Sequence, residues 1–275
     1  MRLSAMIALA ALAGLEAVGA RVGWGKTVAL ALAVFFAASG AGALNHYFER
    51  DVDPLMSRTA GRPLVEGSLT PRRVFFLGMG FIFLGVSLGV TVLHPLVGLH
   101  IFLGAFVYLV VYTVWLKRRT WLNVVVGGLS GSFAVLAGGA AARPELCLPP
   151  VILAAALFFW SPAHFWGLAL AYEDDYRRAG IPMLPVVRGR EETARAVILN
   201  GLLVAVLALL AAVPGKLGWL YLGGALLSGW LFLLYAFRLL RAPDDRRRAV
   251  AVYRASMVQL GILFLGLFLD RFLFP

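Results

Sequence analysis

The amino-acid sequence predicts an all-α membrane protein, a polytopic bundle of nine transmembrane helices in one domain over residues 1–275. Of the 275 residues, 61% are hydrophobic and only 14% are charged. The mean hydropathy of +0.86 is higher than the core of a soluble domain requires. The apolar residues form long runs separated by short basic segments, and each run is about long enough to cross a hydrocarbon layer of ~30 Å.

The nine spans follow one another with short polar connections. The first run, after Met1-Arg2, ends in Ala17-Val18-Gly19-Ala20 and also fits a signal peptide. We interpret it as a retained helix, because only nine spans give the loops a consistent orientation. The later runs are each bounded by charged, Gly or Pro residues. In order, the spans lie near residues 3–20, 27–47, 73–93, 95–116, 121–142, 149–171, 193–213, 217–238 and 250–273.

Glycines in the fifth span indicate close packing between helices. They occur as Gly127-Gly128, Gly131 and Gly138-Gly139, and small residues let transmembrane helices approach closely. A phosphate-binding loop would need a preceding strand and a P-loop lysine, and neither accompanies these glycines.

The basic residues predict the orientation. The loops after spans 2, 4, 6 and 8 hold most of the 25 Lys and Arg residues. By the positive-inside rule, these loops and the N-terminus are cytoplasmic, and the C-terminus lies on the opposite side of the cell (inner) membrane. The net charge of +11 therefore reflects membrane topology, and we expect no nucleic-acid partner. The single cysteine, Cys147, excludes an intramolecular disulfide.

An acidic cluster at the end of the second span is the most informative motif. Asn45, Glu49 and Asp53 are spaced four residues apart, so a continuing helix would place them on one face. Such a row of oxygen ligands suits Mg²⁺ carrying a diphosphate. The alternative is a solvated helix end with Arg50 as a local partner. Asp51 points elsewhere, and we expect it to pair with a neighbouring Arg or to support the ligands from behind.

A second acidic cluster follows the sixth span, on the same predicted side of the membrane. Glu173-Asp174-Asp175 precedes a loop containing Arg and Pro, as the first cluster does. Two facing sets of carboxylates with nearby Arg and Lys suit a diphosphate that Mg²⁺ bridges. An anion transporter would not need clustered acids, and a cation transporter would hold them nearer the membrane midplane.

These motifs resemble a known family. Asn45-x₃-Glu49-x₃-Asp53, followed by Arg58-Thr59-x₂-Arg62-Pro63-Leu64, is similar to the first aspartate-rich motif of UbiA-type intramembrane prenyltransferases. The branch that matches best is that of the protoheme IX farnesyltransferases (haem O synthases). Its further motifs run from Tyr112-Thr113 to Asn123, through His164-Phe165-Trp166, and from Asp174-Asp175-Tyr176 to Val187.

The resemblance implies a UbiA-like fold with its active-site cavity on the cytoplasmic side. It also implies an Mg²⁺-dependent transfer of farnesyl from farnesyl diphosphate to a vinyl group of haem B, with addition of water, giving haem O. The implied catalytic residues are Asn45, Glu49, Asp53, Asp174 and Asp175, of which all but Asp174 would hold Mg²⁺. The implied substrate-binding residues are Arg58, Arg62, Lys117, Arg118, Tyr112 and His164.

His164 has two interpretations. It lies about 16 Å deeper than Asp175 along a helix rising ~1.5 Å per residue, so it is too far away to share a metal ion. It either meets the substrate, as a haem-iron ligand or a polar contact, or is a buried histidine bonded to a neighbouring helix.

The rival functions are a UbiA-type prenyltransferase acting on a quinone precursor or a chlorin, a multi-helix transporter, and a haem-binding assembly protein without catalysis. Besides its two substrates and the lipid bilayer, we expect contact with later haem-modification or oxidase-assembly proteins.

Overall fold

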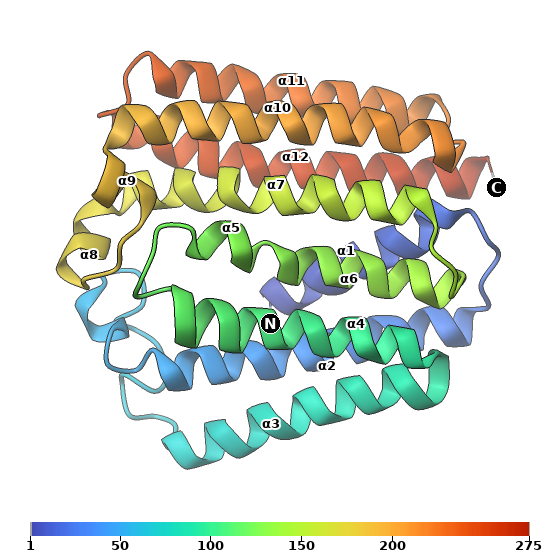
Figure 1. Ribbon diagram of the computed structural model, residues 1–275, viewed down its shortest axis with the longest axis horizontal. Coiled ribbons are helices and arrows are strands. Elements are labelled where there is room, and N and C mark those ends of the chain that lie inside the picture. Colours follow the sequence, from blue (N-terminus) through green and yellow to red (C-terminus); the bar gives the residue numbers. More distant parts are fainter. Residues whose placement is uncertain (1, 275) are drawn as a thin grey trace.

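The computed structural model describes residues 2–274. These residues form one bundle of long helices that run roughly parallel or antiparallel to one another (Figure 1). The long elements begin where the sequence supplies a helix start. Pro71, Pro95 and Pro149 occupy first-turn positions, where a missing N–H is tolerated. The Asp245 side chain caps the last helix by accepting a 2.8 Å hydrogen bond from the Arg247 amide.

The element bounds agree closely with the nine predicted spans. They are α1 Arg2–Val18, α2 Trp24–Phe48, the 3₁₀ turn η1 Asp53–Leu55, α3 Pro71–Leu88, the π-helical η2 Gly89–Leu93, α4 Pro95–Phe106, the π-helical η3 Val107–Leu116, α5 Asn123–Gly127, α6 Leu129–Ala142, α7 Leu148–Ala171, α8 Glu173–Arg178, α9 Leu184–Arg188, α10 Arg190–Gly215, α11 Trp219–Leu240 and α12 Arg246–Leu273.

Eight helical segments among the described residues are long and apolar enough to cross a membrane. The first predicted span is shorter, because its apolar helix covers Leu3–Val18. Large apolar side chains such as Phe83, Trp219 and Trp24 are 75%, 87% and 82% exposed. Exposure on this scale marks a surface that faces lipid, so the chain is a polytopic membrane protein.

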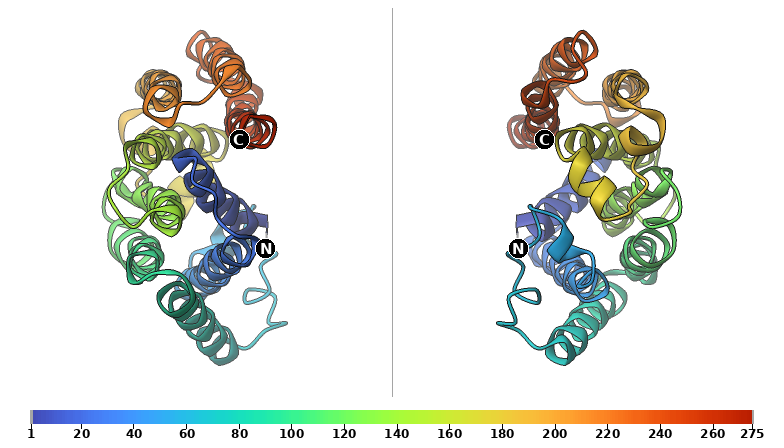
Figure 2. Two further views of the ribbon diagram at one scale, coloured as in Figure 1. Left: turned by 90° about the vertical axis from the view of Figure 1, so that its right-hand side faces the viewer. Right: turned by 90° about the vertical axis from the view of Figure 1, so that its left-hand side faces the viewer.

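Helix α1 lies between the N-terminal and C-terminal groups of helices in the end-on views (Figure 2), in contact with α2, α6, α7 and α12. Its packing on α6 requires glycine. A Cβ added at Gly138 would lie 1.7 Å from the Ala11 carbonyl oxygen, and one at Gly14 would lie 2.0 Å from that of Val135. The predicted use of Gly138 for close helix packing is confirmed.

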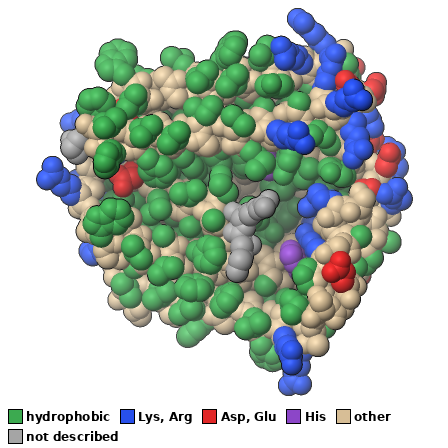
Figure 3. Space-filling view, turned by 180° about the vertical axis from the view of Figure 1, so that it is seen from behind, with side chains coloured by type: hydrophobic (Ala, Val, Ile, Leu, Met, Phe, Trp, Pro, Cys, Tyr) green, Lys and Arg blue, Asp and Glu red, His purple; other side chains and the backbone are tan. Residues whose placement is uncertain are grey.

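The connections after α2, η3, α7 and α11 all lie at one end of the bundle, on the left of Figure 1. This end carries most of the Lys and Arg side chains seen from behind, whereas hydrophobic side chains cover the rest of that face (Figure 3). The four arginine-rich loops therefore share one end, as their charge pattern predicted. Both acidic clusters belong to these loops.

Candidate active site

The first acidic cluster differs from the sequence prediction in its backbone. Helix α2 ends at Phe48, Glu49 is its C-cap, and Asp53 begins the turn η1, so the three residues do not lie along one continuous helix. The four-residue spacing survives nevertheless. The Glu49 amide donates to the Asn45 carbonyl at 3.0 Å, and the Asp53 amide donates to the Glu49 carbonyl at 2.8 Å. These helix-like bonds keep the three side chains together after the helix has ended.

Glu49 and Asp53 are almost completely buried, with relative exposures of 4% and 1%. Buried carboxylates need positive or hydrogen-bonding partners. Arg62 supplies one, because its Nη1 lies 2.7 Å from each Asp53 carboxylate oxygen and 3.4 Å from Glu49 Oε2. Lys117 supplies the other by donating from Nζ to Glu49 Oε1. The result is an alternating network of two acids and two bases.

This network sets the ionisation of its acids. Burial alone would raise the pKa of Glu49, but the charges of Lys117 and Arg62 outweigh it and hold that pKa below its usual value. Burial raises the pKa of Asp53, and the hydrogen bonds from Arg62 offset only part of that effect.

The π-helix η3, a form that frequently occurs at functional sites, contributes Thr113 and, at its C-cap, Lys117 to the cluster. Asn45 Nδ2 donates to Thr113 Oγ1 at 3.1 Å, and Thr113 Oγ1 donates to the Tyr108 carbonyl at 2.8 Å. Tyr112 lies on the same segment, and Lys117 Nζ is 5.6 Å from its ring centroid. An aromatic face therefore borders the ionic network.

The second cluster is joined to the first loop through Ser57. The Ser57 amide and hydroxyl both donate to Asp175 Oδ2, at 2.9 and 2.5 Å, while Arg178 binds the other oxygen. Burial opposes ionisation of Asp175, but the bonds from Ser57 and the charge of Arg178 lower its pKa overall. The predicted approach of the two acidic loops is thus present as a direct contact between them.

Glu173 and Asp174 are adjacent in the sequence but lie in different surroundings. The Asp174 side chain is 77% exposed and contacts only Arg177, at 3.3 Å, among the described residues. Glu173 is 6% exposed, accepts a bond from Arg177 and lies 2.6 Å from Arg190 Nε. Glu173 therefore anchors this loop to the start of α10, while Asp174 faces outward.

The remaining predicted residues lie around the network rather than in it. Arg58 is exposed. Arg118 forms a two-point pair with Asp51, with both N–O distances at 2.8 Å, which gives Asp51 the neighbouring Arg partner expected for it. His164 Nδ1 lies 2.7 Å from Ser256 Oγ of α12, and its ring stacks on Trp160 with centroids 4.4 Å apart. His164 therefore has the interhelical bond of a buried histidine, and Nδ1 is engaged.

The donor set partly fits a divalent cation. No three Asp, Glu, His or Cys side chains in the described part of the chain converge as a metal site. Glu49 and Asp53 do converge, on the same Arg62 nitrogen. Mg²⁺ is commonly held by only one or two carboxylates together with substrate phosphates, so this pair fits a cation that arrives with a diphosphate.

Sequence reasoning missed Ser57, Thr113 and Glu173 as members of the site. Thr113 belongs to the motif that runs from Tyr112 to Asn123, so the sequence contained a signal for it. Glu173 directly precedes Asp174, and a change of direction after α7, which ends at Ala171, buries it. No local pattern singles out Ser57, because its role depends on a partner 118 residues away.

Comparison with known proteins places the chain among prenyltransferases. A model of the UbiA prenyltransferase family matches residues 4–263. Protoheme IX farnesyltransferase 2 of Paramagnetospirillum magneticum is 46% identical over 275 residues, covering 99% of this chain and 95% of the relative.

Two solved structures share the fold. One is of a digeranylgeranylglyceryl phosphate synthase in membranes, with a TM-score of 0.80 at 18% identity, covering 98% of this chain and 94% of that one. The other is of a UbiA homologue from Archaeoglobus fulgidus bound to DMAPP and Mg²⁺, with a TM-score of 0.66 at 16% identity, covering 97% and 98%.

Proposed function

The chain belongs to the UbiA prenyltransferase family, and we propose that it transfers the farnesyl group of farnesyl diphosphate to a vinyl group of haem B, with addition of water, giving haem O and diphosphate. The observation that carries the choice of acceptor is the 46% identity to a protoheme IX farnesyltransferase over 99% of the chain. The single domain proposed here extends over the full length of that match.

Asn45, Glu49, Asp53 and Asp175 are the proposed holders of Mg²⁺. When bound, Mg²⁺ would neutralise diphosphate oxygens and so make diphosphate a better leaving group. Support comes from the convergence of Glu49 and Asp53 and from the UbiA homologue that is bound to DMAPP and Mg²⁺. Asp174, which was expected to act with Asp175, is proposed only as an outer contact because its side chain is exposed.

Arg62 and Lys117 are the proposed diphosphate clamp. In the structure they neutralise Glu49 and Asp53, with side chains only 17% and 12% exposed. Bidentate Arg–phosphate pairing is strong and directional, so both bases can exchange carboxylate oxygens for diphosphate oxygens when the substrate enters. Arg58 and Arg118 lie at the exposed margin and add positive charge there.

The reaction breaks the bond between farnesyl C1 and the diphosphate oxygen, and the electron pair leaves with the diphosphate. The vinyl π pair of haem B forms the new carbon–carbon bond, and water captures the resulting cation with loss of a proton. The faces of Tyr112 and Tyr108, stacked 5.8 Å apart, can stabilise an allylic cation beside Glu49 and Lys117. His164 is the proposed haem contact through Nε2, because Nδ1 is engaged by Ser256.

The clustering of the arginine-rich loops supports a cytoplasmic active site with the N-terminus inside and the C-terminus outside. Both substrates and haem O are hydrophobic, so the reaction takes place at the cell (inner) membrane. A later haem-modification or oxidase-assembly protein in the same bilayer is the proposed recipient of the product.

The test supplies purified, reconstituted protein with farnesyl diphosphate, Mg²⁺ and either haem B or 4-hydroxybenzoate, and identifies products by mass spectrometry. We expect haem O and diphosphate from haem B, loss of turnover with EDTA, and recovery with added Mg²⁺. Prenylated 4-hydroxybenzoate without haem O from folded protein would overturn the assignment of the acceptor.

A further inference from the structure

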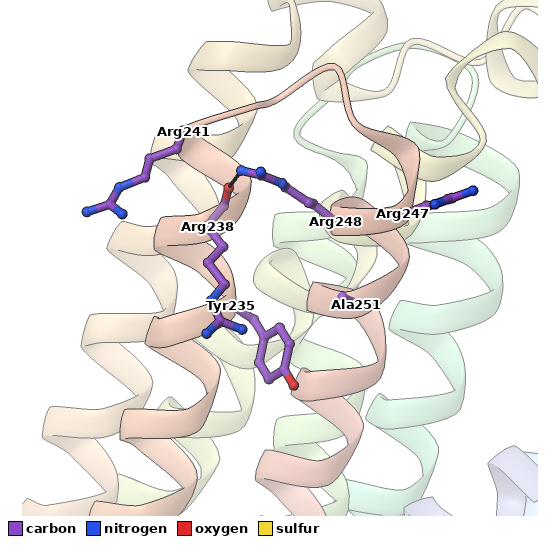
Figure 4. A pocket seen from close by; sticks show the side chains of 6 residues that line it. All are labelled: Tyr235, Arg238, Arg241, Arg247, Arg248 and Ala251. Atoms are coloured by element: carbon purple, nitrogen blue, oxygen red, sulfur yellow. Dashed lines mark hydrogen bonds between the residues drawn. The ribbon is translucent and has the colours of Figure 1, made fainter.

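A second basic site lies at the same end of the bundle as the acidic loops, between the end of α11 and the start of α12. It is a cavity of about 390 Å³ lined by Tyr235, Arg238, Arg241, Arg247, Arg248 and Ala251 (Figure 4). Two of its arginines come from each helix. None of the lining residues has a part in the reaction proposed above.

The inner part of the cavity is built by one arginine from each helix. Arg248 reaches from α12 and donates from Nη1 to the Arg238 carbonyl at 2.6 Å. The Arg238 guanidinium lies 5.5 Å from the centroid of the Tyr235 ring, which forms the deeper wall. In Figure 4, Arg241 and Arg247 extend outward from opposite sides and form the rim.

Positive charge in this cavity is only partly neutralised. Asp245 is the nearby acid, with Oδ2 3.3 Å from Arg248 Nε, and its other oxygen caps the Arg247 amide. Asp244 lies instead 3.8 Å from Arg190. Within residues 2–274, neither Arg241 nor Arg247 forms a salt bridge. The site therefore has spare capacity for an anion.

The three consecutive arginines at the start of α12 make different contacts. Arg246 Nε donates to the Ala171 carbonyl at 2.9 Å, and its guanidinium lies over the Tyr172 ring at 5.3 Å, so it fastens α12 to the end of α7. Arg248 reaches across the cavity instead, whereas the Arg247 side chain extends outward at its rim (Figure 4). Helix anchoring thus accounts for Arg246, and Arg248 also joins α12 to α11 through the Arg238 carbonyl. Within the range that the structure describes, the Arg247 side chain makes no such bond, so its charge is left for a ligand.

We propose that this cavity binds the phosphate headgroup of an anionic phospholipid. Arginines pair strongly with phosphate oxygens, and basic pockets between transmembrane helices at a membrane surface are suited to lipid headgroups. On the same two helices, α11 exposes Trp230 and Phe237 by 61% and 49%, and α12 exposes Val258 by 51%. These apolar side chains offer acyl chains a surface, which a free phosphate would not use, and this favours the lipid.

The experiment measures lipid binding to the purified full chain by native mass spectrometry, with phosphatidylglycerol and phosphatidylcholine titrated separately. We expect a preference for phosphatidylglycerol that falls about tenfold in Arg238→Gln/Arg248→Gln. The rim variant Arg241→Gln/Arg247→Gln, which breaks no hydrogen bond or salt bridge made by these side chains, should show a smaller loss in the same direction. It keeps the test valid if the first variant does not fold.

The matched control is Arg72→Gln/Arg73→Gln, which removes the same charge from two exposed arginines at the start of α3. It should retain the preference of the wild type. Equal phosphatidylglycerol affinity in wild type, pocket variants and control would overturn the proposal. Displacement of bound phosphatidylglycerol by millimolar inorganic phosphate, with no preference over phosphatidylcholine, would overturn the choice of a lipid.

Discussion

The two acidic loops obtain their positive partners from different places. Glu49 is neutralised by Lys117, which is 68 residues away in the sequence, and Asp53 is neutralised by Arg62. The side chains of Lys117 and Arg62 are only 12% and 17% exposed. Asp175 pairs with Arg178 of its own short helix, and that arginine is 62% exposed. The first loop is therefore an enclosed ionic network that a substrate must enter, while the second has a partner that can swing into water at little cost.

The difference indicates a division of labour between loops that look alike in sequence. A charge change in the enclosed network leaves a buried group uncompensated, which is costly. In the second loop, Arg178 is exposed to solvent, so water can compensate part of a charge change at Asp175. We therefore expect effects on turnover to decrease from the first loop to the second, and from buried to exposed members within each loop.

Asp53→Asn should produce the largest loss. It preserves the shape of the side chain but removes one of the two carboxylates that meet at Arg62, so kcat for haem O formation should fall about 10²–10³-fold. The matched control is Asp51→Asn, two residues away, where the side chain is 60% exposed and paired with Arg118. Similar losses of kcat in both variants would show that burial of the carboxylate does not determine its importance for turnover.

The positions of the helices could be predicted because the preference for lipid is a local property of each apolar run. The span near 149–171 became α7 Leu148–Ala171, for example, and the span near 95–116 became α4 and η3 with the same ends. The first span differs in length, because its apolar helix covers only Leu3–Val18 and ends before Gly19, which takes a positive φ of 70°.

The site was predictable only in part. The four-residue spacing of Asn45 and Glu49 predicted that they lie close together, because one turn of helix separates them. Lys117 was identified by resemblance alone, since no rule of spacing connects it to Glu49. The roles of Ser57 and Glu173 were not predicted, because they arise when separate loops dock, and docking depends on side chains distant in the sequence.

Asp175→Asn should have the next largest effect. Asp175 is 6% exposed and accepts two bonds from Ser57, and hydrogen bonds to charged groups contribute about 1.5–3 kcal/mol. We expect turnover to fall about 10–100-fold. Asp174→Asn, at the exposed neighbour, should stay close to wild type. Steady-state rates of haem O formation separate the two variants, and a stronger effect at Asp174 would reverse the assignment made here.

Ser57→Ala should give a smaller loss, of about 3–10-fold, because the backbone amide of residue 57 still donates to Asp175. If Ser57 positions Asp175 for substrate, KM for farnesyl diphosphate and kcat will change together, and Ser57→Thr will restore the hydroxyl and the rate. The lost hydrogen bond should lower the stability by at most about 1.5–3 kcal/mol. A fall in stability without a change in either kinetic constant would make the contact structural only.

Glu173→Gln should affect turnover least and stability most. Glu173 holds Arg177 and Arg190, and Arg190 in turn donates to the Asp244 carbonyl at 3.1 Å, so one buried carboxylate connects α8, α10 and the loop before α12. Losing its charge should cost about 1–3 kcal/mol and lower the Tm by roughly 2–10 °C.

The control for this prediction is Glu191→Gln, which removes an acid that is 64% exposed and paired with Arg195 one turn away, where a loss of at most a few tenths of a kcal/mol is expected. Thermal unfolding followed by circular dichroism in detergent gives the Tm, and haem O formation well below the transition gives turnover. If Glu173→Gln instead keeps its Tm and loses turnover, the second loop contains a catalytic carboxylate at 173, and the contrast between a reactive first loop and a supporting second loop fails.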